Sequence, residues 1–466
     1  MNATQPLTHS VGIILAAGHG SRMRSRIPKP LHTAAGKELI RYPVDLLTKC
    51  GIKNIVVVAS PSNLASLTAV VGDTVQYVVQ PTADGTADAV SWGLSALDYA
   101  PELVMVMAAD TPLVRAKSLR LLIDEHTSVP NRRMTILTAT DVFAPDLGRI
   151  ERVAPGDPSA VGPVAAIVEA RDRGDDSASF EPAEVNTGVY CFDGPWLSRN
   201  LGSIPRAPSG ELYLTALTKL AAQAGDEVVA APFAWADEAM GVNDRQQLSA
   251  VSTVLQDRIN SHWMLEGVTI IDPATTYIDA DVTIGMDTVI RPNTMLSGQT
   301  IIGEECEIGP NSVIHDSVVG ERCSVVASTV EESSIHADVS IGPYSHLRPQ
   351  SVIERGVHLG NYVEVKNSRI GSSSAAGHFS YLGDADIGPG VNIGAGAITC
   401  NYDGVSKHRT TVEAGSFIGC DTMLIAPVTV GARALTGAGS VVTKDVPPAG
   451  RVAGVPARLL APPDEE

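Results

Sequence analysis

Ile387-Gly-Pro-Gly-Val-Asn-Ile393-Gly contains two Ile-Gly pairs six residues apart, and this spacing decides the fold of the second half of the chain. From about Thr269 onward, similar pairs begin at Ile284, Ile302, Ile308, Val319, Ile341, Leu359, Ile370, Ile418 and Val430. A six-residue period is typical of a parallel β-helix, in which three short strands make one triangular coil. We expect the apolar residue to point into the prism and the glycine to permit the tight corner that follows. A Gly-rich β-sandwich is the alternative, but sandwich strands do not keep one short fixed period.

The repeat is interrupted twice, at Ser372–Ser380 and at Thr399–Thr411. Insertions in a solenoid become loops on one face, which is often the binding face. We therefore expect a loop and part of a binding site at each interruption.

The first half of the chain follows a different pattern. Short apolar runs at Val11–Leu15, Ile55–Ala59 and Leu103–Met107 alternate with amphipathic stretches such as Leu39–Cys50. This order is typical of βαβ units and predicts a Rossmann-like α/β domain with a mostly parallel sheet. Ligands of such sheets bind at the carboxyl ends of the strands.

A helix is predicted between the two patterns, over Asp244–Glu266, because Leu248, Val251, Leu255 and Ile259 share one helical face. The predicted organisation is an α/β domain over 11–243, a helical linker over 244–267 and a left-handed parallel β-helix over 268–460.

Composition restricts the partners. The formal net charge of −18 argues against nucleic acid. No apolar run approaches the roughly 20 residues of a membrane helix, and the first ten residues lack a secretory pattern. The six cysteines form no CxxC pair, which favours reduced thiols and a cytoplasmic location.

A glycine-containing loop follows the first predicted strand. It reads Leu15-Ala-Ala-Gly-His-Gly-Ser-Arg-Met-Arg24 and is followed by Ile27-Pro-Lys-Pro-Leu31. Gly18 and Gly20 would let backbone N–H groups approach a triphosphate, and Arg22 and Lys29 would supply positive charge where pyrophosphate leaves. The loop is neither a Walker loop nor a dinucleotide fingerprint, since no GK[ST] follows and Met23 replaces the last glycine.

This string resembles the sugar-1-phosphate nucleotidyltransferases. With the β-helix behind it, the chain resembles, over about residues 11–460, the family of bifunctional N-acetylglucosamine-1-phosphate uridyltransferases / glucosamine-1-phosphate N-acetyltransferases of bacterial cell-wall precursor synthesis. The resemblance includes Gly241-Val-Asn-Asp-Arg245. It implies acetyl transfer from acetyl-CoA to glucosamine-1-phosphate, then uridylyl transfer from UTP to N-acetylglucosamine-1-phosphate with Mg²⁺. It also implies a homotrimer with acetyl-transfer sites between subunits.

For the first reaction centre, the resemblance implies catalytic roles for Arg22 and Lys29 and Mg²⁺ ligation by Asp110 and Asn243. The positions implied to bind UTP and the UDP-sugar are Leu15, Ala16, Ala17, Gly18, Lys29, Gln80, Gly85, Thr86, Gly148, Glu169, Asn186 and Asn243. Among these, the segment of Gln80, Gly85 and Thr86 would read uracil. Asp110 could instead form a turn or a helix cap, and Asn243 could cap the following helix.

For acetyl transfer, the ammonium of an amino sugar must lose a proton before it attacks a thioester, and a neutral imidazole suits that task. His378 is the candidate base, although a loop histidine is the alternative. By resemblance, the amino sugar phosphate would be bound by Arg348, Lys366, Tyr381 and Asn392. Acetyl-CoA would be bound by Ala395, Asn401, Tyr402, Lys407, Cys420, Ala438 and Arg458.

Two further points concern the coenzyme region. Cys420 is expected to be inert packing rather than a nucleophile. The C-terminal Ser-Arg-Val-Pro of the family is Ala453-Gly-Val-Pro456 here, so Arg458 or Arg451 would replace the missing arginine.

The chain departs from the family near the nucleotide and sugar pockets. The usual GTGHA is Gly85-Thr-Ala-Asp-Ala89, and the usual NxQGExYLTD is Ala207-Pro-Ser-Gly-Glu-Leu-Tyr-Leu-Thr-Ala216. These changes leave open a different sugar or nucleotide preference, with acetyl transfer to another amino sugar phosphate. A non-catalytic regulatory homologue is the third alternative.

Overall fold

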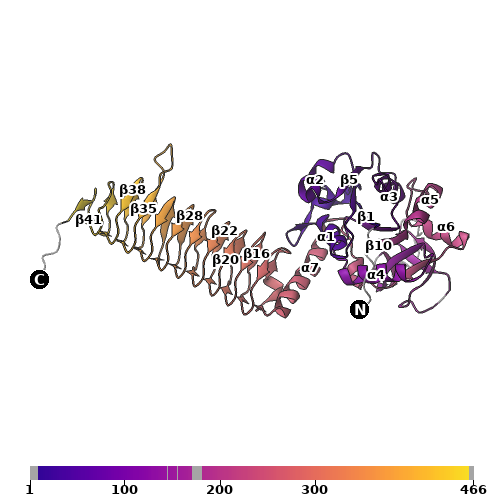
Figure 1. Ribbon diagram of the computed structural model, residues 1–466. Helices are drawn as coiled ribbons and strands as arrows, with labels where there is room; N and C mark the ends of the chain where they lie inside the picture. The colour runs from indigo at the N-terminus through magenta and orange to yellow at the C-terminus, as the bar shows by residue number, and fades with distance from the viewer. Residues whose placement is uncertain (1–8, 144, 155, 171–180, 461–466) are drawn as a thin grey trace. The chain divides into compact units, whose positions relative to one another are not determined.

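The computed structural model describes residues 9–143, 145–154, 156–170 and 181–460 (Figure 1). The chain divides into two compact units between Leu255 and Gln256.

The first unit is built on a nine-stranded sheet with the order β5-β4-β1-β6-β10-β7-β11-β9-β8. Four neighbouring strands are parallel and include the three predicted apolar runs: β1 (Ser10–Leu15), β4 (Ile55–Ala59), β5 (Gln76–Val79) and β6 (Leu103–Ala108). β10 (Ala183–Asp193) runs antiparallel to β6 and to β7 (Met134–Val142). The remaining strands are β11 (Val228–Ala231), β9 (Gly162–Val168) and β8 (Arg149–Arg152).

Both faces of this sheet are covered, because successive strand residues point to opposite sides. Ile14 belongs to one buried cluster and Ile13 to the other. The helices are α1 (Arg41–Lys49), α2 (Leu64–Val71), α3 (Thr86–Ser95), α4 (Ala116–Ser128), α5 (Gly194–Asn200) and α6 (Ala216–Ala224). A small ribbon of β2 (Thr33–Ala34) and β3 (Lys37–Glu38) lies outside the main sheet.

The second unit is a left-handed β-helix whose short strands stack in parallel as three sheets. The first sheet contains β12 (Thr269–Ile270), β15 (Val289–Ile290), β18 (Glu307–Ile308), β21 (Ser324–Val325), β24 (Ser340–Ile341), β27 (His358–Leu359), β30 (Ala375–Ala376), β33 (Asn392–Ile393), β36 (Phe417–Ile418), β39 (Leu435–Thr436), β41 (Arg451–Ala453) and an antiparallel last strand, β42 (Arg458–Leu459).

The second sheet contains β13 (Tyr277–Ile278), β16 (Met295–Ser297), β19 (Val313–His315), β22 (Thr329–Glu331), β25 (His346–Leu347), β28 (Val363–Lys366), β31 (Ser380–Gly383), β34 (Ile398–Cys400), β37 (Met423–Ile425) and β40 (Val441–Val442). The third contains β14 (Thr283–Ile284), β17 (Ile301–Ile302), β20 (Val318–Val319), β23 (Ser334–Ile335), β26 (Val352–Ile353), β29 (Arg369–Ile370), β32 (Ala385–Ile387), β35 (Thr410–Val412) and β38 (Val428–Val430).

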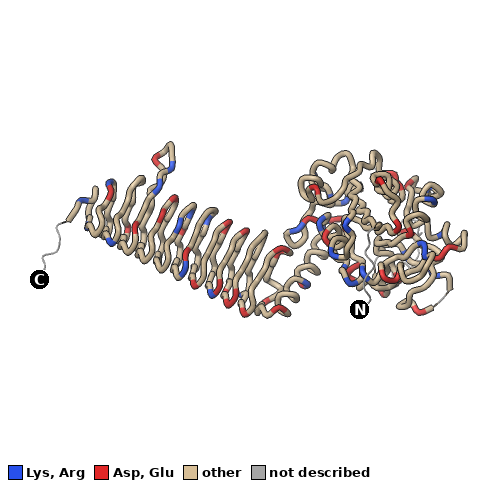
Figure 2. The backbone as a smooth tube through the Cα atoms, viewed as in Figure 1, with Lys and Arg blue, Asp and Glu red and all other residues tan. Residues whose placement is uncertain are grey.

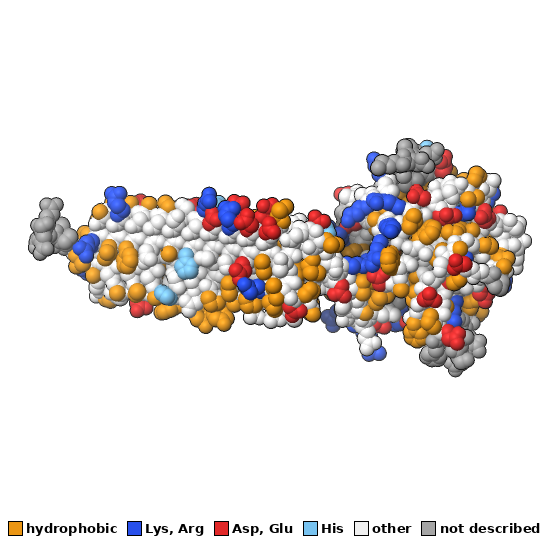
Figure 3. Space-filling model, turned by 90° about the horizontal axis from the view of Figure 1, so that it is seen from below, with side chains coloured by type: hydrophobic (Ala, Val, Ile, Leu, Met, Phe, Trp, Pro, Cys, Tyr) orange, Lys and Arg blue, Asp and Glu red, His pale blue; other side chains and the backbone are white. Residues whose placement is uncertain are grey.

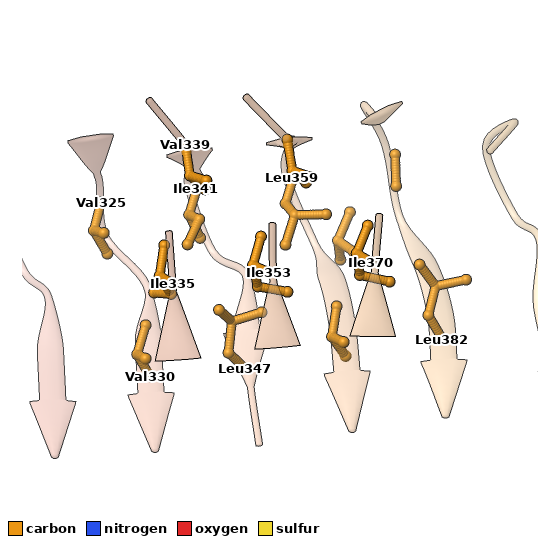
Figure 4. Packing of buried hydrophobic residues seen from close by; sticks show 14 of the residues in the cluster. Val325, Val330, Ile335, Val339, Ile341, Leu347, Ile353, Leu359, Ile370 and Leu382 are labelled. Carbon is orange, nitrogen blue, oxygen red and sulfur yellow. The ribbon is translucent and has the colours of Figure 1, made fainter. Parts of the chain in front are cut away.

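The apolar residue of each repeat points into the prism, as the period predicts. Figure 4 shows Ile335, Leu347, Ile353 and Leu359 directed toward the interior from strands of different sheets. Each coil therefore buries its apolar side chains only against the coils next to it.

The reason for the repeated glycine differs from the prediction. A Cβ on Gly285 would lie 2.6 Å from the backbone nitrogen of Glu304 in the next coil, and one on Gly303 would lie 2.7 Å from that of Glu321. The left-handed corner conformation falls instead on non-glycine residues such as Asp287 and Glu305. At Gly285 and Gly303 glycine is thus required for the close approach of successive coils rather than for the corner, whereas Gly309 and Gly342 also have positive φ, of 96° and 103°.

Only one of the two predicted interruptions is a loop. Within Ser372–Ser380, the residues of β30 pair in register with β27 and β33, so the coil continues and the predicted loop is wrong there. Between β34 and β35 the chain leaves the coils at Asn401–Arg409 and projects outward (Figure 1).

The predicted connecting helix is α7 (Arg245–Leu265). Its first half packs Leu248, Val251 and Leu255 into a cluster of the first unit. In the second unit, Ile259 and Trp263 pack against the core of the β-helix. No helix of the described residues is both long and apolar enough to cross a membrane.

Candidate active sites

The first candidate site lies at the carboxyl ends of the parallel strands. The backbone N–H of Ala109 donates to Leu15 O at 3.0 Å, which places the segment after β6 beside the start of the glycine-containing loop. The loop bends at Gly20, where φ is 57° and a Cβ would lie 2.8 Å from Lys29 Cβ. Ala16 and Ala17 are buried at the base of the loop, whereas Gly18 has open space beside it.

One lysine side chain and two side-chain oxygens, which could also be metal ligands, meet at this position. Lys29 Nζ forms an ion pair with Asp110 Oδ2 and lies 3.3 Å from Asn243 Oδ1. Asn243 is brought there because Val242 N donates to Asp110 O at 3.0 Å. The capping alternative for Asn243 does not apply, because Asp244 accepts the hydrogen bond from Gln247 N at 2.9 Å. Asp110 and Asn243 thus direct their oxygens at one cationic group.

The predicted base-reading residues are fixed to one another. Gln80 follows β5, is 4% exposed, and donates from Nε2 to Gly85 O at 3.2 Å and to Asp88 Oδ2 at 2.7 Å. Thr86 Oγ1 accepts from Leu214 N at 2.9 Å. The structure therefore brings Gln80, Gly85 and Thr86 together and adds Asp88, to which no role was given from the sequence.

The three predicted sugar-contacting residues also lie together. Asn186 N donates to Gly148 O at 2.9 Å, and a Cβ on Gly148 would lie 3.6 Å from Glu169 Oε2. Glu169 accepts a hydrogen bond from Thr215 at 2.6 Å and lines a cavity of about 480 Å³. The altered segment 207–216 contributes to the lining of this cavity.

Arg22 is exposed, and the structure places it in the short 3₁₀ turn η1 (Ser21–Met23) after the glycine-containing loop. Among the predicted cations of this loop, Lys29 is therefore the one that contacts the two metal-ligand candidates.

The second candidate site lies on the β-helix, where strand register stacks polar side chains. Glu364 pairs with Tyr381, and Lys366 pairs with Gly383, in the neighbouring strands β28 and β31. Arg348 Nη1 donates to Glu364 Oε1 at 2.9 Å. The register thus places Arg348, Lys366 and Tyr381 on one face of the prism.

Three cations lie close together on this face. The pKa of Lys366 is lowered from its ordinary value, first by Lys407 beside it and then by Arg348. Lys407 belongs to the projecting loop, which carries both basic and acidic positions (Figure 2). Like charges that repel one another favour an anion, since a bound anion would relieve their repulsion.

Asp384 is a functional candidate that sequence reasoning missed. Its buried carboxylate accepts from Asn367 Nδ2 at 2.6 Å and from Asn401 Nδ2. Burial raises the pKa of Asp384, but the hydrogen bonds from both asparagines and the charges of Lys407 and Lys366 outweigh it and leave the pKa below its ordinary value. The available signal was its position in the sequence, three residues after Tyr381 and six after His378 in the same segment.

The coenzyme candidates divide into two groups. Asn401 is buried and bonded to Asp384, so it anchors the projecting loop, whereas Tyr402 and Lys407 are exposed on that loop. Ala395, Cys420 and Ala438 follow one edge of the prism, as shown by hydrogen bonds from Asp421 N to Ala395 O at 2.7 Å and from Gly439 N to Cys420 O at 2.8 Å. Cys420 is exposed, so its expected role in packing is wrong.

The remaining candidates do not share the face of Arg348. Asn392 is exposed on the first sheet of the β-helix, between Ala375 and Phe417 of the neighbouring strands. His378 is exposed at the corner between β30 and β31. Arg458 is exposed in β42, opposite Ala453.

A nucleotidyltransferase-type α/β unit followed by a hexapeptide β-helix defines a class of two-domain transferases. Comparison with known families agrees, since residues 12–149 match the MobA-like NTP transferase domain and residues 332–367 match the bacterial transferase hexapeptide (six repeats).

Full-length relatives identify the family. The chain is 42% identical to the bifunctional protein GlmU of Geobacillus sp. (strain WCH70), over 93% of each chain. It is 42% identical to that of Exiguobacterium sibiricum, over 93% of this chain and 95% of the relative. It is 41% identical to that of Pelobacter propionicus, over 93% of each chain. The chain belongs to the GlmU family and is a bifunctional enzyme with a nucleotidyltransferase and an acetyltransferase domain.

Proposed function

We propose that the first unit transfers the uridylyl group of UTP to N-acetylglucosamine-1-phosphate and releases pyrophosphate. The convergence of Asp110 and Asn243 on one cationic group beside the glycine-containing loop is the observation that carries this proposal. Phosphoryl-type transfer needs mainly positioning and charge neutralisation, so no protein nucleophile is required. The sugar phosphate attacks the α-phosphate in line, and Lys29 and Arg22 are the cations offered to the departing pyrophosphate.

The oxygens of Asp110 and Asn243 fit Mg²⁺. Mg²⁺ takes oxygen ligands and keeps several waters and substrate phosphate oxygens, so one carboxylate and one amide from the protein suffice. The contact of the Lys29 ammonium with both oxygens supports a cation site at this pair. Mg²⁺ bound there would neutralise charge on the phosphate oxygens.

For the second unit, we propose acetyl transfer from acetyl-CoA to glucosamine-1-phosphate. Arg348 and Lys366 would bind the sugar phosphate, because strand register places them on one face with Tyr381, and Lys407 of the coenzyme loop lies beside Lys366. The amine attacks the thioester carbonyl and His378 takes a proton from the nitrogen. The C–S bond then breaks, and the coenzyme leaves as a thiolate that recovers this proton to become the thiol. Asn401 and Tyr402 would hold the loop that borders the coenzyme.

A cytoplasmic homotrimer is part of the same proposal. The β-helix exposes a column of apolar side chains in register, Tyr277, Met295 and Val313, on the second sheet. Figure 3 shows hydrophobic side chains gathered at several places on the visible face of this unit. Light scattering should give three times the mass of one chain, and a monomer would contradict this part of the proposal.

A different sugar or nucleotide preference is the second candidate function. The observation that favours it is that the altered segment 207–216 lines the cavity beside Glu169. Pyrophosphate release with another donor or sugar phosphate, and none with UTP and N-acetylglucosamine-1-phosphate, would support it.

The experiment follows free thiol and pyrophosphate separately in one mixture of glucosamine-1-phosphate, acetyl-CoA, UTP and Mg²⁺. Asp110→Ala should abolish pyrophosphate release and leave thiol release intact, whereas His378→Ala should abolish thiol release. With N-acetylglucosamine-1-phosphate supplied, His378→Ala should still release pyrophosphate. Loss of thiol release in Asp110→Ala, or loss of pyrophosphate release in His378→Ala when N-acetylglucosamine-1-phosphate is supplied, would contradict two separate sites.

A further inference from the structure

The amide of Gln80 can face its neighbours in only one orientation. Its two partners, Gly85 O at 3.2 Å and Asp88 Oδ2 at 2.7 Å, are both acceptors. An amide oxygen turned toward them would leave acceptors facing acceptors, so the nitrogen must point that way. Both N–H groups of the amide are thereby used.

The amide oxygen of Gln80 is left as an unused acceptor. Gln80 is 4% exposed, and Oε1 makes no hydrogen bond within the part of the chain that the structure describes. This oxygen is open to a donor group of a bound ligand. A ligand group at this position gains a hydrogen bond only if it carries an N–H or O–H.

Asp88 is the side chain that fixes the orientation of the Gln80 amide. It lies in the first turn of α3, where a carboxylate is also favoured by the positive end of the helix. Helix stabilisation alone would not require its Oδ2 to lie 2.7 Å from the amide of Gln80. Its position is the one at which the related GTGHA segment carries histidine, which could present either a donor or an acceptor.

The segment around Asp88 is itself held in place. Leu212 N donates to Asp84 O and Ala87 N donates to Leu212 O, both at 2.9 Å. A Cβ on Gly85, whose φ is 114°, would lie 2.4 Å from Leu212 O. The carboxylate is thus presented to Gln80 from a fixed backbone rather than from a freely moving loop.

We propose that Asp88 is a specificity-determining positioning residue that locks Gln80 with its oxygen toward the base. This inference rests on the proposed nucleotidyl transfer and deepens it. A uracil or thymine ring carries N3–H and satisfies the Gln80 oxygen. A cytosine ring presents an unprotonated N3 acceptor, which leaves two acceptors opposed. The pocket therefore selects UTP over CTP through a carboxylate that does not touch the nucleotide.

The test compares wild type, Asp88→Ala and Asp88→Asn with UTP and CTP, using Mg²⁺ and N-acetylglucosamine-1-phosphate. Asp98→Ala is the matched control, because Asp98 is an exposed carboxylate after the same helix. In Asp88→Ala only the longer hydrogen bond to Gly85 O still orients the amide, so the UTP/CTP ratio of kcat/KM should fall about tenfold, mainly through KM. Asp88→Asn still offers an acceptor and should retain most of the ratio. Using the ratio cancels the general gain in nucleotide affinity from removing a negative charge.

Binding of UTP and CTP to the same four proteins, measured by calorimetry, separates this inference from the proposed function. Turnover of UTP with an unchanged ratio in Asp88→Ala would overturn the inference and leave the function intact. Preferential UTP binding that disappears in Asp88→Ala would support the inference even if no sugar phosphate reacted. Equal binding of UTP and CTP by wild type, or binding of neither, would overturn it.

Discussion

The two units hold their positive charges in opposite ways. In the first unit, Lys29 is paired with Asp110 and Asn243. On the β-helix, Lys366 lies beside Lys407 and Arg348, and their repulsion lowers its pKa. A paired cation can be exchanged or redirected when a metal and a triphosphate arrive. On the β-helix, Glu364 already pairs with Arg348 and Asp384 lies near both lysines, but the pKa of Lys366 is still lowered, so a bound anion would relieve the remaining repulsion. This difference fits a first unit that neutralises the charge of a departing pyrophosphate and a second unit that binds the phosphate of a sugar.

Lys29→Met should produce the largest difference between the activities of the two units. Without the ammonium, the departing pyrophosphate loses a positioned cation, so uridylyl transfer should fall by about 10³-fold. Acetyl transfer should be unchanged, as measured by thiol release in the same sample. Comparable loss of both activities would show that the substitution acts on the whole chain rather than on one site.

Lys366→Met should weaken capture of the sugar phosphate. A charged hydrogen bond to phosphate is lost, so KM for glucosamine-1-phosphate in thiol release should rise about 10- to 100-fold with a smaller change in kcat. Lys444→Met is the control, because Lys444 is an exposed lysine of a later coil. An unchanged KM would remove Lys366 from the proposed phosphate site.

Asp384→Ala should loosen the projecting loop. The amides of Asn367 and Asn401 would lose their acceptor in a buried position, at a cost of about 1–3 kcal/mol. Limited proteolysis within 401–409 should accelerate, and KM for acetyl-CoA should rise while uridylyl transfer is retained. Unchanged protease sensitivity would show that the loop is held by other contacts.

The pH dependence of sugar phosphate binding tests whether Lys407 lowers the pKa of Lys366. Lys366 has a lowered pKa when free, and a bound phosphate would raise it, so binding weakens as pH rises through the free-state pKa. In Lys407→Met the main cause of the lowering is removed, so this loss should move to higher pH. KM for glucosamine-1-phosphate measured between neutral and alkaline pH checks the direction, and a shift to lower pH would contradict it.

Asp84→Ala should have the smallest effect. Asp84 pairs with Arg206 through two hydrogen bonds, but both side chains are substantially exposed and screened by solvent. The backbone bonds to Leu212 remain, so KM for UTP should change by no more than about threefold. A larger change would show that this exposed pair, rather than Leu212, holds the base-reading segment.

Period and strand pattern were sufficient to predict both architectures. The six-residue repeat requires three sheets, because it places one apolar residue inside the prism on each side of every coil. The loop with Gly18 and Gly20 could be predicted because its residues are adjacent in sequence. Local pattern could not assign the purpose of Gly285, since the atom that excludes a Cβ belongs to the next coil. The local pattern also predicts an interruption at Ala375–Ala376, because the usual Ile-Gly pair is absent there. These residues nevertheless pair with the strands of the neighbouring coils and continue the sheet.

The sequence by itself determined the two fold types, the connecting helix, and the residue types offered to phosphates and to an amine. Only the tertiary structure decided which of them meet. It paired Lys29 with Asp110 across 81 residues, set Asp384 between Asn367 and Asn401, and turned Gln80 toward Asp88. Hydrogen-bond partners are chosen by position in space, and residues that are far apart in the chain become neighbours only when the sheet and the coils are assembled.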